Sequence, residues 1–443
     1  MYDERIDIMK ISINIKNIVI YICFFFILLY PFNSTISTLI YKNNMVLLFS
    51  IIVPLVILMF INFRGKLSKK LILIFIITLI LLAFVLYKNW YISYGNELKA
   101  IIFVIYLFVP FVLSINREWI GSFLKVVKIF LFEHMFFTYI ALIFKDFYSN
   151  NILTFVARNS ENCPAVGNFY HGYIPGLTTH FSTNAIYLSI AVLMFFAIYI
   201  YNRKKTNMMY FILALIALFT VGKRAHLIFS IVCCLVLYVY YKKEIKFSTI
   251  IKVICVLVIG VIFIVILSNY IPEVMNIITR FDSLIDSGDV LNGRDELYEL
   301  AFKLWNRNII FGNGWGAFSY YYQQTLYYFG SARYLDAHNV FLQLLCETGI
   351  IGATLFIGIM LTILLNSIKL LKSTDLVNNE KVALGFCVAY QLFFLMYCMT
   401  GNPLYDPQTY VIYFISIAIY LTLFLKYRRE SVKNEKSRNS NNT

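Results

Sequence analysis

A histidine stands where a polar segment of the chain turns into a long apolar run. The segment reads Asp336-Ala337-His338-Asn339, and the apolar run begins directly after it. The positive end of a helix dipole disfavours the imidazolium ion, so a histidine at the start of a helix should hold a neutral ring. A neutral imidazole can accept a proton, and this position therefore predicts a general base at His338.

A row of polar residues follows the histidine. Asn339, Gln343 and Glu347 recur at every fourth position, which places them on one face of an otherwise apolar helix. Glu347 should lie about 12 Å along the helix from Asn339. Ionisable groups at such a depth usually face a bundle interior or a wet cavity. The row indicates a polar site, although a helix-cap cluster with a paired glutamate is an equally good interpretation.

Two adjacent cations interrupt another apolar stretch. Lys223 and Arg224 lie within residues 208–241. The planar guanidinium of arginine stays charged and matches the geometry of phosphate oxygens, so the pair suggests an anion site. The alternative is a helical hairpin whose tip is merely solvated.

The composition defines the setting of these residues. Of 443 residues, 60% are hydrophobic and only 14% are charged, whereas soluble domains have about 25% charged residues. Apolar runs of about 20 residues, enough to cross a hydrocarbon core of about 30 Å, occur about twelve times. We therefore predict an all-α, polytopic integral membrane protein. The expected spans are 15–33, 45–62, 71–88, 98–115, 120–144, 184–201, 208–222, 225–241, 249–270, 340–366, 382–400 and 409–425.

The basic residues predict the orientation. Lys and Arg are concentrated in the set of alternate loops that includes both termini. Because cytoplasmic loops carry this excess, both termini should be cytoplasmic. The net charge of +15 then follows from membrane topology and gives little support for nucleic-acid binding. The first apolar run follows acidic residues without a small-residue cleavage site, so it should be a retained anchor.

The long loops predict the domain organisation. Residues 1–270 should form nine transmembrane helices with an outer loop at 145–183, and 271–339 should form a second long outer loop. Three further helices are expected in 340–425, followed by a disordered cytoplasmic tail at 426–443. Both long loops fall on the extracytoplasmic side, which indicates that the protein acts there.

The second long loop has structure of its own. Apolar residues at 297, 300, 301, 304 and 305 have helical spacing, which predicts an amphipathic helix at the membrane interface. The glycines at 312, 314 and 316 then predict a tight turn, whose backbone could approach a ligand or serve as a turn only. The aromatic residues that follow could stack on sugars or belong to an interfacial belt.

Several common chemistries have no signature in this sequence. Only Cys163 of the eight cysteines falls in a loop, so no disulfide framework can form within the loops. The chain has no CxxC or HExxH spacing for a metal and no GxxxxGK[ST] phosphate loop. No cofactor is predicted.

Together these motifs resemble the O-antigen polymerase and O-antigen ligase superfamily. The match is sharpest over 290–352, with looser similarity in topology elsewhere. The resemblance implies a GT-C-like membrane glycosyltransferase that uses no metal and a glycan on undecaprenyl diphosphate as donor. It implies that Arg224 and Arg294 bind the diphosphate and that His338 acts at the acceptor hydroxyl. The remaining residues expected to bind substrate are Lys223, Trp305, Asn339, Gln343 and Glu347.

The residue types suit this chemistry. A sugar hydroxyl that attacks an anomeric carbon needs a general base, worth typically 10²–10⁴-fold in rate. The diphosphate that leaves develops negative charge, which two arginines could stabilise.

Three functions remain open. The first is polymerisation of lipid-linked oligosaccharide repeats into O-antigen, capsule or exopolysaccharide, at the outer face of a bacterial cytoplasmic membrane. The second is ligation of finished glycan to lipid A core or to a protein, which uses nearly the same motifs. The third is transport of the lipid-linked precursor, which predicts polar sites near the midplane. The expected partners are the lipid-linked glycan donor and acceptor, the bilayer, a chain-length regulator and a flippase.

Overall fold

The structure is a computed structural model in which all secondary structure of the described residues is helical. It describes residues 15–29, 53–58, 97–114, 118–157, 163–242, 294–327, 335–372 and 376–441. The principal helices are α1 (Ile15–Leu28), α5 (Glu97–Leu113), α6 (Trp119–Ile143), α9 (Pro164–Tyr170), α10 (Phe181–Asn202), α11 (Lys205–Thr220), α12 (Arg224–Tyr241), α15 (Asp295–Trp305), α16 (Ala317–Tyr327), α17 (Val340–Leu371), α18 (Asn378–Cys398) and α19 (Pro407–Asn441). Between α6 and α9 lie the short helices α7 (Lys145–Phe147) and α8 (Thr154–Val156), with the π-helix η2 (Tyr148–Leu153) between them.

Six helices of the described segments are long and apolar enough to cross a membrane. They are α6, α10, α12, α17, α18 and the first part of α19. These helices confirm the prediction of an all-α fold with several membrane spans. The expected span at 208–222 corresponds to α11, which is apolar but has only 16 residues. The expected spans at 71–88 and 249–270 lie outside the described residues, as does most of 45–62.

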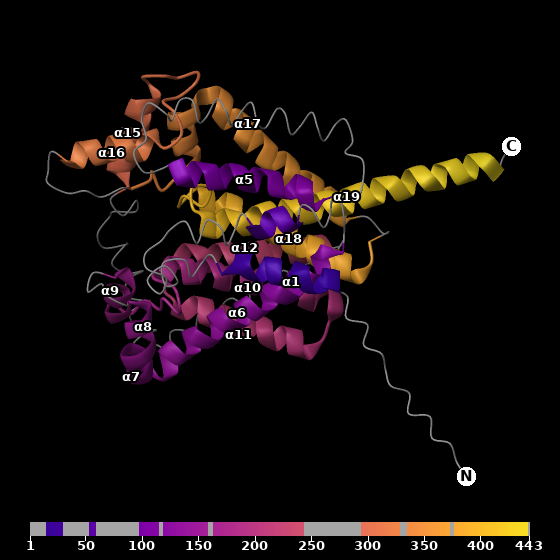
Figure 1. The fold of residues 1–443 in the computed structure, drawn as a ribbon, viewed down its shortest axis with the longest axis horizontal. Coiled ribbons are helices and arrows are strands. Elements are labelled where there is room, and N and C mark those ends of the chain that lie inside the picture. Colours follow the sequence, from indigo (N-terminus) through magenta and orange to yellow (C-terminus); the bar gives the residue numbers. More distant parts are fainter. Residues whose placement is uncertain are drawn as a thin grey trace, which may run out of the picture.

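Helices α10 and α18 form the centre of the bundle (Figure 1). Within the most apolar 18-residue stretch of each helix, 89% of α10 is buried inside the protein, whereas only 22% of α17 is buried. Ala185, Ser189 and Ala191 of α10 are fully buried, and such small residues allow neighbouring helices to approach closely. Helix α10 packs against α6, α11, α12 and α18. Helix α17 lies at the periphery, where its exposed apolar side chains suit contact with lipid.

Several helices begin at the same end of the bundle. The Lys223 ammonium donates a hydrogen bond of 3.0 Å to Ser182 Oγ, which joins the start of α12 to the start of α10. The Tyr187 hydroxyl donates to the Gln408 carbonyl at 3.1 Å, which joins α10 to the start of α19. Helices α15 and α16 lie at this end as well (Figure 1).

Helix α17 is broken after its first turns. Gly349 has φ 66° and ψ −172°, which lies outside the helical region. The turn at 309–314 docks on this break through its backbone. Asn313 N–H donates to the Cys346 carbonyl at 3.0 Å, and Ile350 N–H donates to the Ile309 carbonyl at 2.9 Å. The groups that the broken helix leaves without partners are satisfied in this way.

Gly312 of the glycine-rich turn therefore lies directly against the backbone of α17. A Cβ at Gly312 would stand 2.4 Å from the Glu347 carbonyl oxygen, and one at Gly349 would stand 2.2 Å from the Ile310 carbonyl oxygen. The Asn313 amide also donates to the carbonyls of Leu304, at 2.7 Å, and Cys346, at 2.9 Å. These contacts agree with the interpretation that this segment serves as a turn only.

We expect Gly349→Ala to unfold the end of the bundle that carries α15. Alanine has to adopt a positive φ there and has no space for its Cβ, so the loss of stability should exceed about 2 kcal/mol. The matched control is Gly358→Ala, because Gly358 lies in the same helix with no atom near its would-be Cβ. Thermal unfolding of the purified variants in detergent measures both. Equal unfolding temperatures for the two variants would contradict the prediction.

Helix α15 confirms the expected amphipathic helix, and its apolar face packs on protein. Leu297, Ala301 and Leu304 are buried against Phe318 and Cys346. The apolar residues of α15 recur at helical spacing because they pack on α16 and α17. The sequence alone had suggested that this face lies at the membrane interface.

Candidate functional site

His338 precedes the N-cap of α17 and has a left-handed backbone, with φ 52°. A positive φ is uncommon for residues other than glycine and is often found at functional sites. Burial lowers the pKa of His338 most, and the Arg294 guanidinium lowers it next. Asp336 raises this pKa and Lys223 lowers it further. Together, burial and the two cations lower the pKa of His338 and favour its neutral imidazole.

Two cations from distant parts of the sequence meet beside this histidine. Burial lowers the pKa of Lys223 to about 8, and the charge of Arg294 is the next cause. Arg294 precedes α15, and Lys223 precedes α12. Like charges held together disfavour each other's charged form. A bound anion would remove this repulsion, so the pair is suited to an anion.

The two cations stand at the starts of two helices, and the starts of two further helices lie near them. The residues that precede α10, α12, α15 and α17 are His180, Lys223, Arg294 and Asn339. Lys223 acts electrostatically on both His180 and His338, which shows that these helix starts share one region. The N-terminus of each helix carries partial positive charge. The region is therefore electropositive beyond its two side-chain cations.

Asn339 and Gln343 use their side chains within the protein. Asn339 caps α17, because its Oδ1 accepts from Phe341 N–H at 3.0 Å and Leu342 N–H at 3.2 Å. Gln343 Oε1 accepts from Ala337 N–H at 3.0 Å. The cap interpretation therefore describes Asn339, and Gln343 fixes the backbone directly before His338.

Two carboxyl groups lie on either side of Gln343, one buried (Glu347) and one half-buried (Asp336). Gln343 Nε2 donates to Asp336 Oδ1 and to Glu347 Oε1, both at 3.1 Å. Glu347 Oε1 also accepts from Phe318 N–H at 3.3 Å. Asp336 additionally accepts from Ser319 Oγ at 2.8 Å. These bonds connect α16 and α17 to the segment that carries His338.

The structure separates Trp305 from the other predicted residues. Trp305 ends α15 and donates its indole N–H to the Ile309 carbonyl at 3.2 Å. Arg294 lies at the opposite end of the same helix, about 16 Å away at 1.5 Å per residue. Arg224, by contrast, is the first residue of α12 and directly follows Lys223.

A small open hollow adjoins Asp336. Its volume is ≈ 370 Å³ including the space at its mouth. Aromatic rings form much of its wall, with Trp315 stacked on Phe103 at 4.7 Å and on Tyr405 at 4.5 Å between ring centroids. Burial and then the Glu347 carboxylate raise the pKa of Tyr405 well above its ordinary value. The complete lining is Phe103, Trp315, Gly316, Ser319, Asp336, Leu404, Tyr405 and Tyr410.

His180 and Asp336 were not among the site residues predicted from the sequence. His180 lies four residues before the expected span at 184–201, and a histidine shortly before a span is the signal that identified His338. Asp336 was noted only as part of the segment before His338. Its contacts with Ser319 and Gln343 depend on the fold.

The described residues form a helical bundle of the membrane-protein class, with a cationic end beside a histidine whose pKa is lowered. Residues 209–357 match the family model described as O-antigen ligase. This match confirms the resemblance to the O-antigen ligase and polymerase superfamily and supports a glycosyltransferase-like enzyme. The matched segment contains Lys223, Arg224, Arg294 and His338. No curated protein matches the chain.

Proposed function

We propose that this protein polymerises oligosaccharide repeats carried on undecaprenyl diphosphate. The observation that carries the proposal is the placement of Lys223 and Arg294, from distant segments, within electrostatic reach of each other and of His338. A diphosphate bound between the two cations would have its anomeric carbon near the histidine. We place this polymerisation reaction at the outer face of the bacterial cytoplasmic membrane.

The proposed reaction is a single displacement at the anomeric carbon. The neutral His338 accepts the proton of the acceptor hydroxyl, and the acceptor oxygen forms the new glycosidic bond. The bond from the anomeric carbon to the diphosphate oxygen breaks, and undecaprenyl diphosphate leaves with the bonding electrons. Lys223, Arg224 and Arg294 stabilise its charge, which is the role that a metal has in many other phosphate sites.

Asp336, Gln343 and Glu347 position the base in this mechanism. Gln343 holds Ala337 N–H and Asp336 Oδ1 with its two polar atoms. Asp336 also raises the pKa of His338 against the effect of the cations. The imidazole therefore keeps some affinity for the proton that it has to accept.

The length and aromatic content of the expected outer segments favour a polymerase, because they could hold both a donor glycan and an acceptor that carries repeats. The second candidate is a ligase, which the description of the matching family favours. Both activities need the same donor site and the same base.

Deletion of the gene in its own host should separate the two activities. Loss of a polymerase leaves single repeat units on the final surface acceptor, because ligation is intact. Loss of a ligase leaves long chains on undecaprenyl diphosphate and none on the surface acceptor. Gel separation of the surface glycan and of the extracted lipid-linked glycan measures both. Long lipid-linked chains in the deletion strain would overturn the polymerase and support the ligase.

A further inference from the structure

His180 caps α10 through its imidazole ring. The ring nitrogen Nδ1 accepts a hydrogen bond of 3.1 Å from Ser182 N–H. Because a backbone N–H can only donate, Nδ1 carries no proton in this bond. The proton of the neutral ring therefore lies on Nε2, which becomes a hydrogen-bond donor with a fixed direction.

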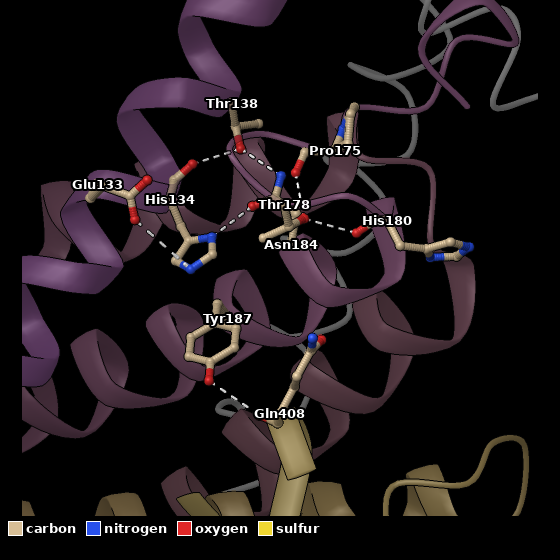
Figure 2. Close-up of polar contacts among 9 residues, drawn as sticks. All are labelled: Glu133, His134, Thr138, Pro175, Thr178, His180, Asn184, Tyr187 and Gln408. Carbon is tan, nitrogen blue, oxygen red and sulfur yellow. Dashed lines mark hydrogen bonds and ion pairs between the residues drawn. The ribbon is translucent and has the colours of Figure 1, made fainter. Parts of the chain in front are cut away.

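The loop that leads to His180 is tied to the interior of the bundle. In Figure 2, Asn184 stands at the centre of a buried polar cluster. Its Nδ2 donates to the Ile174 carbonyl at 3.0 Å and to Thr138 Oγ1 at 2.9 Å. Its Oδ1 accepts from His134 Nδ1 at 3.0 Å. Helix α6 thereby holds both α10 and the loop before it.

Further bonds fix the last residues of this loop. Thr178 Oγ1 is 2.6 Å from the Pro175 carbonyl and 2.9 Å from the His180 carbonyl (Figure 2). The Tyr148 hydroxyl donates to the Gly176 carbonyl at 2.6 Å. Gly176 has φ +63°, and the Asn184 amide lies 3.1 Å from the position of a Cβ. The backbone of His180 is therefore held firmly, while its ring points away from the buried cluster (Figure 2).

The ring of His180 lies beside Lys223. The His180 and Phe181 rings stack at 4.8 Å between centroids, and Lys223 Nζ lies 5.3 Å from the centroid of the Phe181 ring. The same ammonium donates to Ser182 Oγ at 3.0 Å. The His180 side chain is exposed, and partial desolvation and next the charge of Lys223 lower its pKa. Because Nδ1 accepts a hydrogen bond from Ser182 N–H, the ring is neutral in this structure.

We propose that His180 is a further donor-binding residue, whose Nε2–H binds a diphosphate oxygen of the lipid-linked substrate held by Lys223 and Arg294. This inference rests on the proposed function, because it assigns a further ligand to the same anion site. A neutral hydrogen-bond donor suits this position, since another positive charge would increase the repulsion between the cations already there. The Nε2–H of His180 would orient the diphosphate through a directional hydrogen bond without adding a positive charge.

The test uses His180→Asn in the purified full-length protein in detergent. Asparagine is a strong N-cap residue, so α10 should keep its start while the Nε2–H donor is lost. The probe is a water-soluble diphosphate diester that joins a sugar to a short isoprenoid, with affinity measured by calorimetry. Loss of a hydrogen bond to a charged group should weaken binding roughly 10-fold to 100-fold. The matched control is His171→Asn in the same loop, which should bind the probe as the wild type does.

The outcomes separate this inference from the proposed function. Weaker binding by His180→Asn alone, at an unchanged unfolding temperature, supports it. Unchanged binding by His180→Asn, with binding lost in Arg294→Lys, overturns the role of His180 and leaves the anion site in place. Absence of binding by the wild type overturns both.

A measurement on the wild type covers the case in which the variant does not fold. The chain has five histidines, so nuclear magnetic resonance of ¹⁵N-labelled histidine side chains can follow each ring. The probe should shift one Nε2–H signal of a neutral ring that does not titrate above pH 5. Absence of any such shift at saturating probe contradicts the proposal.

Discussion

Replacement of His338 by asparagine should reduce glycan transfer at least about 100-fold, while the protein stays inserted and abundant. A general base contributes typically 10²–10⁴-fold to the rate, and asparagine cannot accept the proton. Asparagine tolerates the positive φ of this position better than alanine does. The variant His338→Asn therefore tests the chemistry separately from the backbone. The measurement is the length distribution of the glycan in cells with matched protein levels.

The pH dependence provides an independent test of His338. Because the base has to be neutral, activity should fall only as the pH falls through the lowered pKa of His338, below the ordinary value of about 6.5. Arg294 lowers this pKa, so a variant without that charge should lose activity at a higher pH. A normal glycan ladder from His338→Asn would remove the histidine from any essential role. Loss of the protein from the membrane would support a structural role in its place.

Replacement of Arg294 by lysine should weaken donor binding more than 10-fold. A point charge on a flexible stem cannot reproduce the planar guanidinium fork on a diphosphate. Arg294→Ala should be more damaging, because it leaves Lys223 as the nearest remaining cation at the start of α12. Calorimetry with the diphosphate diester measures the affinity, and glycan length in cells measures activity.

Arg307→Lys is the matched control for Arg294. Arg307 follows the end of α15, whereas Arg294 precedes its start. The Arg307 Cζ atom lies 5.3 Å from the centroid of the Tyr321 ring. The Arg307→Lys variant should bind the donor as the wild type does. If Arg294→Lys bound the donor normally but had no activity, Arg294 would be reassigned to the acceptor or to the fold.

The site residues that could be predicted from the sequence are those whose residue type and place before a helix both indicate a function. Lys223, Arg294 and His338 each precede a helix, and a bundle of alternating helices brings such starts to common ends. In the structure the charge of Arg294 acts on Lys223, and the charges of both cations act on His338, which agrees with this expectation. Their mutual distances could not be predicted, because they depend on how α15 folds back on α17.

Contacts made by the backbone could not be predicted from side-chain patterns. The docking of Gly312 on the break in α17 leaves no periodic signal, and a glycine-rich turn beside a ligand has the same composition. The apolar face of α15 was equally ambiguous. A helix that packs on protein and a helix that lies on lipid have the same spacing of residues such as Leu297 and Leu304.

The break at Gly349 has a mechanical consequence for an enzyme in a fluid membrane. The first turns of α17 are bonded to the turn that follows α15, so the elements that carry His338 and Arg294 are packed together. The longer part of α17 exposes Leu355, Ile359 and Leu365, and its tilt should follow the thickness of the surrounding bilayer. The N–H groups of Ile350 and Ile351 bond to the Ile309 and Ile310 carbonyls, so the tilt should change only beyond Ile351. Changes in bilayer thickness should therefore alter the angle of the long segment and leave the spacing between base and cation unchanged.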